Sequence, residues 1–354
     1  MFVSFQLLPA EILLDIARYV SSPELRKMKD SSLTVCSASH AVAILAFYEE
    51  IQLTSARFQR LASTNTIESM KQVTKRLDYQ VRQQWVTSGD TGHQQNAMCI
   101  GPELLYTTVA RCDRLRSFTV ELIGNISNPA WQTPLSERYD LRLIGALWYR
   151  NLKELNISTI ETIGFEQPLP CTVALSQLIA QVDTVTLKMK YICPQILEYI
   201  CPDEFDPHLA DAFLLTPENV PTAMKHTTKP ADVKLKKLTI HLAAMDDYAA
   251  PFIHETPHFS RRCGNNSDLQ LFQPMLDAAA AIVQRVPSIE HLWVIGCFNP
   301  GQQAKPEAWD LAKRVRRVFS AGSWYNCSYD VTSDNFSVFD SDIDDVFQKD
   351  NGVT

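Results

Sequence analysis

Leu152-Lys153-Glu154-Leu155-Asn156-Ile157 is the stretch that decides the fold, because its apolar residues are spaced as in a strand with one buried face. Similar units, each following a Leu-x-x-Leu-x-Leu type of rule, recur at residues 115–122, 182–187, 235–240 and 289–294. We therefore expect five short strands, each with one apolar face and one polar face.

A helical pattern precedes each of these units. The expected helices cover residues 102–111, 139–149, 173–180, 207–215 and 269–286. Alternating helices and strands are typical of parallel strands joined by helical crossovers, so the sequence predicts an α/β fold class. We also expect a last helix over residues 306–319, with Lys313-Arg314-Val315-Arg316-Arg317 on its solvent side, and a strand near residues 325–329.

The strand units are 30 to 54 residues apart, and this arrangement resembles an irregular leucine-rich-repeat solenoid over residues 54–329. A leucine-rich repeat usually has about 20–29 residues, so this array contains insertions. The alternative is a compact α/β domain whose strands share a pattern. Long loops at residues 85–98, 191–232 and 243–266 are expected to form a recognition surface together with the neighbouring strand ends.

Residues 7–20, Leu-Leu-Pro-Ala-Glu-Ile-Leu-Leu-Asp-Ile-Ala-Arg-Tyr-Val, predict an amphipathic helix. Pro9 suits the first helical position, because an N–H group there has no partner within the helix and proline lacks one. No basic residue precedes Arg18, and Glu11 and Asp15 interrupt the apolar run, so the segment lacks the features of a signal peptide. The apolar face of this helix is wider than one packing partner would cover. This width indicates a module that docks onto another protein.

The residues after this helix indicate which kind of docking module it belongs to. They are Leu33-Thr34-Val35-Cys36, an apolar run at residues 41–47, and Tyr48-Glu49-Glu50-Ile51-Gln52-Leu53. With the Leu-Pro start, this order resembles the F-box, a three-helix domain, over residues 1–53. The resemblance implies that a Skp-type adaptor of a cullin ubiquitin ligase binds one set of side chains: Leu8, Pro9, Ile12, Leu13, Ile16, Val35 and Cys36.

F-box segments are often followed by leucine-rich repeats that hold a substrate. The two resemblances together imply the substrate-recognition subunit of a Skp–cullin–F-box E3 ubiquitin ligase, which binds a target protein and performs no bond chemistry itself. The alternative is an interaction scaffold that uses the same repeats without ubiquitin transfer, its first helix serving only to cap the solenoid.

Charge is distributed unevenly along the chain. The net charge is −7, but residues 330–354 hold seven aspartates and one lysine, which gives −6 and leaves the remainder near −1. We therefore expect an acidic, disordered tail at residues 330–354. A nearly neutral body gives no electrostatic case for nucleic-acid binding. No run approaches the ~20 apolar residues of a membrane helix, so no membrane partner is expected.

The nine cysteines form no disulfide framework, and with no leader sequence they indicate a reducing compartment, the cytoplasm or the nucleus. His254-Glu255-Thr256-Pro257-His258 matches a zinc-protease pattern, but Pro257 is incompatible with the helix that this chemistry requires. Phosphate-binding glycine motifs and a Gly-x-Ser-x-Gly elbow are absent from the sequence. We therefore expect no enzyme activity, no metal and no cofactor.

Overall fold

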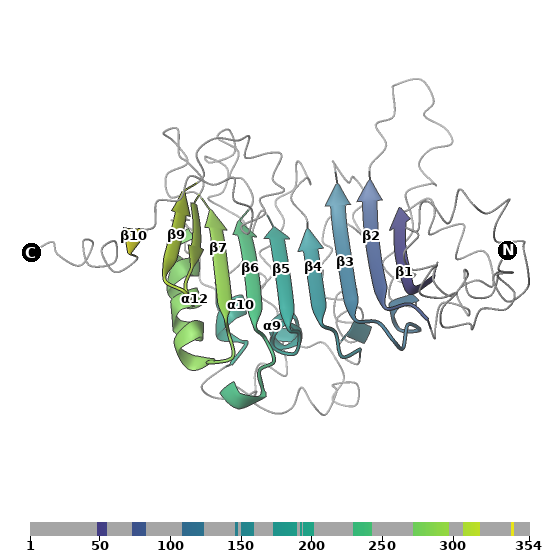
Figure 1. Ribbon diagram of the computed structural model, residues 1–354, viewed down its shortest axis with the longest axis horizontal. Helices are drawn as coiled ribbons and strands as arrows, with labels where there is room; N and C mark the ends of the chain where they lie inside the picture. Colours follow the sequence, from purple (N-terminus) through teal and green to yellow (C-terminus); the bar gives the residue numbers. More distant parts are fainter. Residues whose placement is uncertain are drawn as a thin grey trace, which may run out of the picture.

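The computed structural model describes residues 48–54, 73–82, 108–123, 146–147, 150–158, 173–189, 192, 194–201, 229–242, 272–296, 307–318 and 341–342. Within these residues, ten strands form one mixed sheet whose spatial order follows the chain (Figure 1). The strands are β1 (Glu50–Thr54), β2 (Arg76–Arg82), β3 (Ser117–Ile123), β4 (Glu154–Ser158), β5 (Thr184–Met189), β6 (Lys237–Leu242), β7 (His291–Gly296), β8 (Glu307–Asp310), β9 (Val315–Val318) and β10 (Ser341–Asp342).

The sheet has a parallel part and an antiparallel part. Strands β1 to β7 pair in parallel with their neighbours, so the chain returns to the same edge of the sheet before each new strand. Strands β8, β9 and β10 then continue the sheet in antiparallel pairs. This α/β architecture confirms the coarse fold class predicted from the alternating helices and strands.

Helices cover one face of the sheet. They are α9 (Val173–Ala180), α10 (Gln195–Glu198) and α12 (Phe272–Arg285), and they lie behind the strands in Figure 1. A short 3-10 helix, η5 (Pro230–Asp232), precedes β6. Each parallel pair requires a crossover, and α9 and α12 provide the crossovers into β5 and β7.

The core lies between these helices and the sheet, and alternate strand residues supply one side of it. The buried strand residues are Leu77, Phe118, Val120, Leu155, Ile157, Val185, Leu187, Leu238, Ile240, Leu292 and Val294. The helices supply Leu175, Leu178, Ile179, Met275, Leu276, Ala279 and Ile282. Burying one large apolar side chain contributes about 1.5–3 kcal/mol, so this repeated alternation stabilises the parallel part strand by strand.

The first strand belongs to this same core. Ile51 of β1 is buried and pairs in register with Leu77 of β2, and Tyr48 packs against the core from the helical residues directly before β1. Strand β1 also crosses residues 53 and 54, the boundary that the sequence places between the F-box-like segment and the repeats.

Backbone carbonyls repeat one arrangement where the parallel strands begin, which we call the N-terminal edge of the sheet. The carbonyl of Lys75 accepts the N–H groups of Arg116 and Ser117 at 2.7 and 3.0 Å. The carbonyls of Arg116, Asp183 and Lys236 likewise each accept two N–H groups from the next strand. These repeated contacts fix the register at which each strand enters the sheet.

The five predicted strand units all contain or overlap strands, β3 to β7, and the helix predicted over residues 173–180 coincides with α9. Strand β2 was missed, although Leu77, Tyr79 and Val81 alternate within it. The strand expected near residues 325–329 and the helix over 207–215 lie outside the described residues.

The helix predicted over residues 306–319 is wrong. This stretch forms the β8–β9 hairpin, with a turn at residues 311–314 in which Arg314 has a φ of 58°. The Asp310 carboxylate accepts the backbone N–H groups of Ala312 and Lys313 at 3.1 and 3.2 Å, which stabilises the turn between the two strands. Strand pairing, instead of a helix face, buries the apolar residues Ala308 and Trp309 of this stretch.

Candidate interaction surface

The seven residues predicted to bind an adaptor lie outside the described part of the chain. They are Leu8, Pro9, Ile12, Leu13, Ile16, Val35 and Cys36. From the end of the F-box-like segment, the structure describes Tyr48 and the residues of β1. The loops at residues 85–98 and 243–266, including His254 and His258, also lie outside it.

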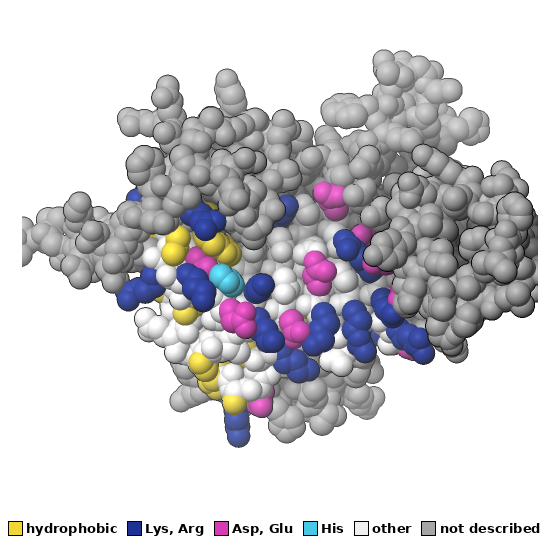
Figure 2. Space-filling view, in the orientation of Figure 1, with side chains coloured by type: hydrophobic (Ala, Val, Ile, Leu, Met, Phe, Trp, Pro, Cys, Tyr) yellow, Lys and Arg dark blue, Asp and Glu magenta, His cyan; other side chains and the backbone are white. Residues whose placement is uncertain are grey.

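The surface that the structure does describe is the sheet face opposite the helices, which we call the open face. Its residues alternate along each strand with those that face the helices. They are Arg76, Asp78, Ser117, Thr119, Glu154, Asn156, Thr184, Thr186, Lys237, Thr239, His291 and Trp293. Figure 2 shows this face with few charged side chains over the middle strands and more charged groups around them.

Register places the side chains of the open face in rows across the sheet. One row runs from Asp78 through Thr119, Asn156, Thr186 and Thr239 to Trp293. Four of these six side chains are threonine or asparagine, which are short and carry both donor and acceptor capacity. The row therefore forms a shallow polar band that ends at an aromatic ring.

Glu154 organises the middle of the open face. Its carboxylate accepts hydrogen bonds from Ser117 Oγ and from Asn156 Nδ2, each at 3.0 Å. Asn156 Nδ2 also lies 3.4 Å from Thr119 Oγ1. On β2, Arg76 Nε contacts both carboxylate oxygens of Asp78 at 3.1 and 3.3 Å. These contacts fix the conformations of the polar side chains on the sheet. Side chains ordered in advance lose less conformational entropy when a partner binds.

Ion pairs connect successive crossovers along the N-terminal edge. Lys153 Nζ lies 2.7 Å from Asp183 Oδ2, and Arg150 Nη1 lies 2.6 Å from Asp113 Oδ1. Lys75 pairs with Glu49 in the same way. The partners are partly exposed, so each pair contributes at most about 1 kcal/mol and serves mainly to orient its side chains.

The β7–β8–β9 corner holds the densest side-chain network described. Asp310 is almost fully buried, with 1% of its side chain exposed, and accepts a 2.7 Å hydrogen bond from Nδ1 of the half-exposed His291. Glu307 accepts hydrogen bonds from Trp309 Nε1 at 3.0 Å and from Arg316 Nε at 2.9 Å. Arg316 stacks over Trp309, and Arg317 stacks over Trp293, each 5.3 Å from the ring centre.

Sequence reasoning missed this corner because the stretch was assigned to a helix. A usable signal was the Glu-Ala-Trp-Asp sequence of β8 opposite Val-Arg-Arg-Val of β9, where acidic and basic side chains face each other across the hairpin. The hairpin also brings Arg317 of β9 over the ring of Trp293, although the two residues are more than twenty positions apart in the sequence.

Two titratable groups are held in their neutral forms. Burial raises the pKa of the Cys112 thiol to about 11, so the thiol is protonated and unreactive near neutral pH. Burial, assisted by the nearby Lys188 ammonium, lowers the pKa of His241 to about 4, so its imidazole is neutral there. Neither group has the pKa near 7 that suits acid–base work.

The described residues contain no group of three or more His, Cys, Asp or Glu side chains that could hold a metal ion. Among the helices they contain, none is long and apolar enough to cross a membrane. No protein-family model matches the chain, and no curated protein matches it either. What the described geometry offers chemically is hydrogen bonding, charge and aromatic contact on a rigid, open sheet.

Proposed function

We propose that this chain is the substrate-recognition subunit of a Skp–cullin–F-box E3 ubiquitin ligase. In this proposal, the three-helix segment at residues 1–53 binds the Skp-type adaptor, and an irregular leucine-rich-repeat-like solenoid at residues 54–329 binds a target protein on its open face. The chain acts in the cytoplasm, the nucleus or both, and needs no cofactor because it carries out no bond chemistry.

One observation carries the recognition half of the proposal. Seven parallel strands follow one another in chain order, helices cover one of their faces, and the other face presents polar side chains, most of them partly or fully exposed. Stacked strand–helix units of this kind create extended surfaces that suit protein partners. Rigid binding surfaces also lose little conformational entropy when a partner binds.

The adaptor half rests on the resemblance of residues 1–53 to an F-box. Each large apolar side chain buried at such an interface contributes about 1.5–3 kcal/mol. A target held beside a ubiquitin-charged enzyme reacts faster because its effective concentration rises, and this requires no catalytic group on the recognition subunit.

The test is co-purification of a Skp-type adaptor with the full chain and with a Leu8→Ala, Pro9→Ala double variant. We expect the double variant to lose the adaptor while its thermal unfolding stays unchanged. Pro287→Ala, at an exposed proline before β7, is the matched control and should retain the adaptor. Undiminished adaptor recovery by the double variant would contradict the assignment.

The scaffold alternative gives a different result in the same experiment. A scaffold would recover protein partners through the open face, but no Skp-type adaptor would be present even with the wild-type chain. The two functions are therefore separated by one mass-spectrometric comparison.

A further inference from the structure

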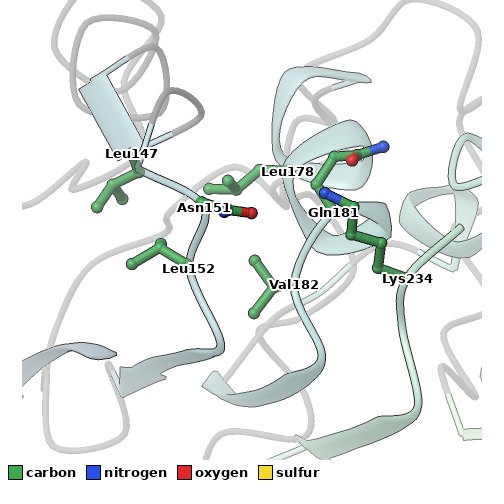
Figure 3. A pocket seen from close by; sticks show the side chains of 7 residues that line it. All are labelled: Leu147, Asn151, Leu152, Leu178, Gln181, Val182 and Lys234. Atoms are coloured by element: carbon green, nitrogen blue, oxygen red, sulfur yellow. The ribbon is translucent and has the colours of Figure 1, made fainter. Parts of the chain in front are cut away.

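A small cavity lies where three successive crossovers enter the sheet (Figure 3). It has a volume of about 130 Å³. Leu147, Leu152, Leu178 and Val182 form its apolar walls, and all four side chains are buried. They come from the helical residues and the turn before β4 and from the end of α9 with its turn into β5, so the cavity sits between neighbouring strand–helix units.

Three polar side chains, Asn151, Gln181 and Lys234, complete the lining. Asn151 and Lys234 are exposed, so the cavity opens to solvent on their side. In Figure 3 the Asn151 amide and the Lys234 ammonium extend toward each other across the apolar residues. Within the described part of the chain, none of these three side chains takes part in a hydrogen bond or ion pair.

The Asn151 side of the mouth is held in place. Asn151 has a φ of 52°, a left-handed conformation that asparagine tolerates better than most residues. Arg116 Nη1 donates hydrogen bonds to the carbonyls of Arg150 and Asn151 at 3.1 and 3.3 Å, which fixes this turn. The amide is therefore presented by a clamped backbone, independently of any ligand.

The Lys234 side of the mouth carries excess positive charge. Residues 229–236 contain three lysines and one aspartate, a net charge of +2, and all four of these side chains belong to exposed residues. Among the described residues, none of these three lysines forms an ion pair. An acidic segment arriving here would meet an ammonium group and an amide beside an apolar cavity.

We propose that this cavity binds one aliphatic side chain of a partner peptide, with a carboxylate on the adjacent residue contacting Lys234 and Asn151. An apolar cavity of about 150 Å³ accommodates benzene, so a cavity of this size suits a leucine side chain. Side chains buried in well-packed pockets contribute much of the binding free energy of an interface. The inference rests on the proposed function in one respect: it takes the peptide to be part of the target protein.

The experiment uses the full chain with methyl-labelled leucine and valine and three capped peptides containing one Leu-Glu, Leu-Gln or Ala-Glu pair. Leu-Glu should shift the methyl signals of Leu147, Leu152, Leu178 and Val182 with a dissociation constant in the millimolar range. Ala-Glu should bind at least about tenfold more weakly, because the cavity then stays unfilled.

Lys234→Gln should weaken Leu-Glu binding about tenfold and leave Leu-Gln binding unchanged, since only the first peptide carries the carboxylate. Lys229→Gln is the matched control on the same lysine-rich segment and should have a smaller effect. Equal binding of all three peptides, shifts confined to other methyl groups, or equal losses of both leucine peptides in Lys234→Gln would each overturn the proposal.

Two further outcomes are distinguishable. The chain's own Ile343-Asp344 has the same chemistry, and clearly tighter Leu-Glu binding after removal of residues 343–354 would assign the cavity to the tail instead of a partner. Lys234→Gln should still recover the Skp-type adaptor, so failure of the pocket and failure of the adaptor assignment give different results.

Discussion

The parallel strands β3–β7 and the antiparallel hairpin β8–β9 belong to one sheet but are stabilised by different means. In the parallel part, buried apolar side chains alternate along every strand: Phe118 and Val120 in β3, and leucine, isoleucine and valine in β4–β7. In the hairpin, all four residues of β8 are buried, and two of them, Glu307 and Asp310, are carboxylates. Repetition of a local apolar pattern builds the first region, whereas a specific network of side chains builds the second.

Because the two regions are stabilised differently, the loss of one side chain should destabilise them differently. An apolar side chain lost from the parallel part leaves a cavity in a core shared by all the crossovers. A carboxylate lost from the hairpin leaves a few unpaired donors at one end of the sheet. The first change should therefore act on the whole sheet and the second locally.

The largest effect is expected from Leu238→Ala in β6. Leu238 is fully buried between Val185 and Leu292 of the adjacent strands, so truncation should lower the free energy of unfolding by about 2–5 kcal/mol. Urea denaturation measures this loss. Thr239→Ala, the next residue and on the open face, is the control and should cost less than about 1 kcal/mol; equal losses would contradict the assignment of the two faces.

A pH effect of similar size is expected from His241 at the end of β6. The folded-state pKa of about 4 lies below the ordinary value of 6.5, so the unfolded chain binds the proton more readily. This contribution to stability is present above pH 6.5 and is lost as the pH falls toward 4, by on the order of 3 kcal/mol.

Urea denaturation of wild type and His241→Gln at pH 7.5 and pH 4.5 measures this pH effect. The variant should show a smaller loss between the two pH values than wild type does. An identical loss in both chains would show that His241 is not the responsible group.

A smaller and local effect is expected from Asp310→Ala in β8. The carboxylate accepts backbone N–H groups from Leu292, Ala312 and Lys313, and these donors would lose their partner, at a cost of about 2 kcal/mol. Hydrogen exchange should accelerate at residues 307–318 and remain unchanged at residues 237–242.

Asp310→Asn is the matched control, because it retains an acceptor oxygen and should accelerate exchange less. Faster exchange throughout β3–β7 in Asp310→Ala would contradict the local role of the hairpin network.

The same contrast explains what could be predicted from the sequence. The strands at 152–157 and 235–240 follow from local alternation, because each needs only one apolar face against the helices. The hairpin could not be predicted in this way. Its stability depends on Glu307 meeting Arg316 and on Asp310 meeting His291, pairs formed only when β8 lies beside β7.

The candidate site was likewise only partly predictable. The polar residues of the open face follow from the alternation that identifies the strands, as Asn156 does between Leu155 and Ile157. Their rows depend on register between strands 30 or more residues apart, which local sequence does not encode. The cavity requires the turn at Asn151 and the segment at Lys234 to approach each other, and their sequence separation of over eighty residues hides that proximity.

The most direct test of the central claim is quantitative affinity purification of wild type and two variants, with a third variant as control. The two variants are the Leu8→Ala, Pro9→Ala double variant and Thr186→Glu, which places a charge in the middle of the open face. Gln284→Glu, exposed on α12, is the charge-matched control. The account predicts that the double variant loses the Skp-type adaptor and keeps the other partners, whereas Thr186→Glu keeps the adaptor and loses them. Loss of neither set in either variant would contradict it.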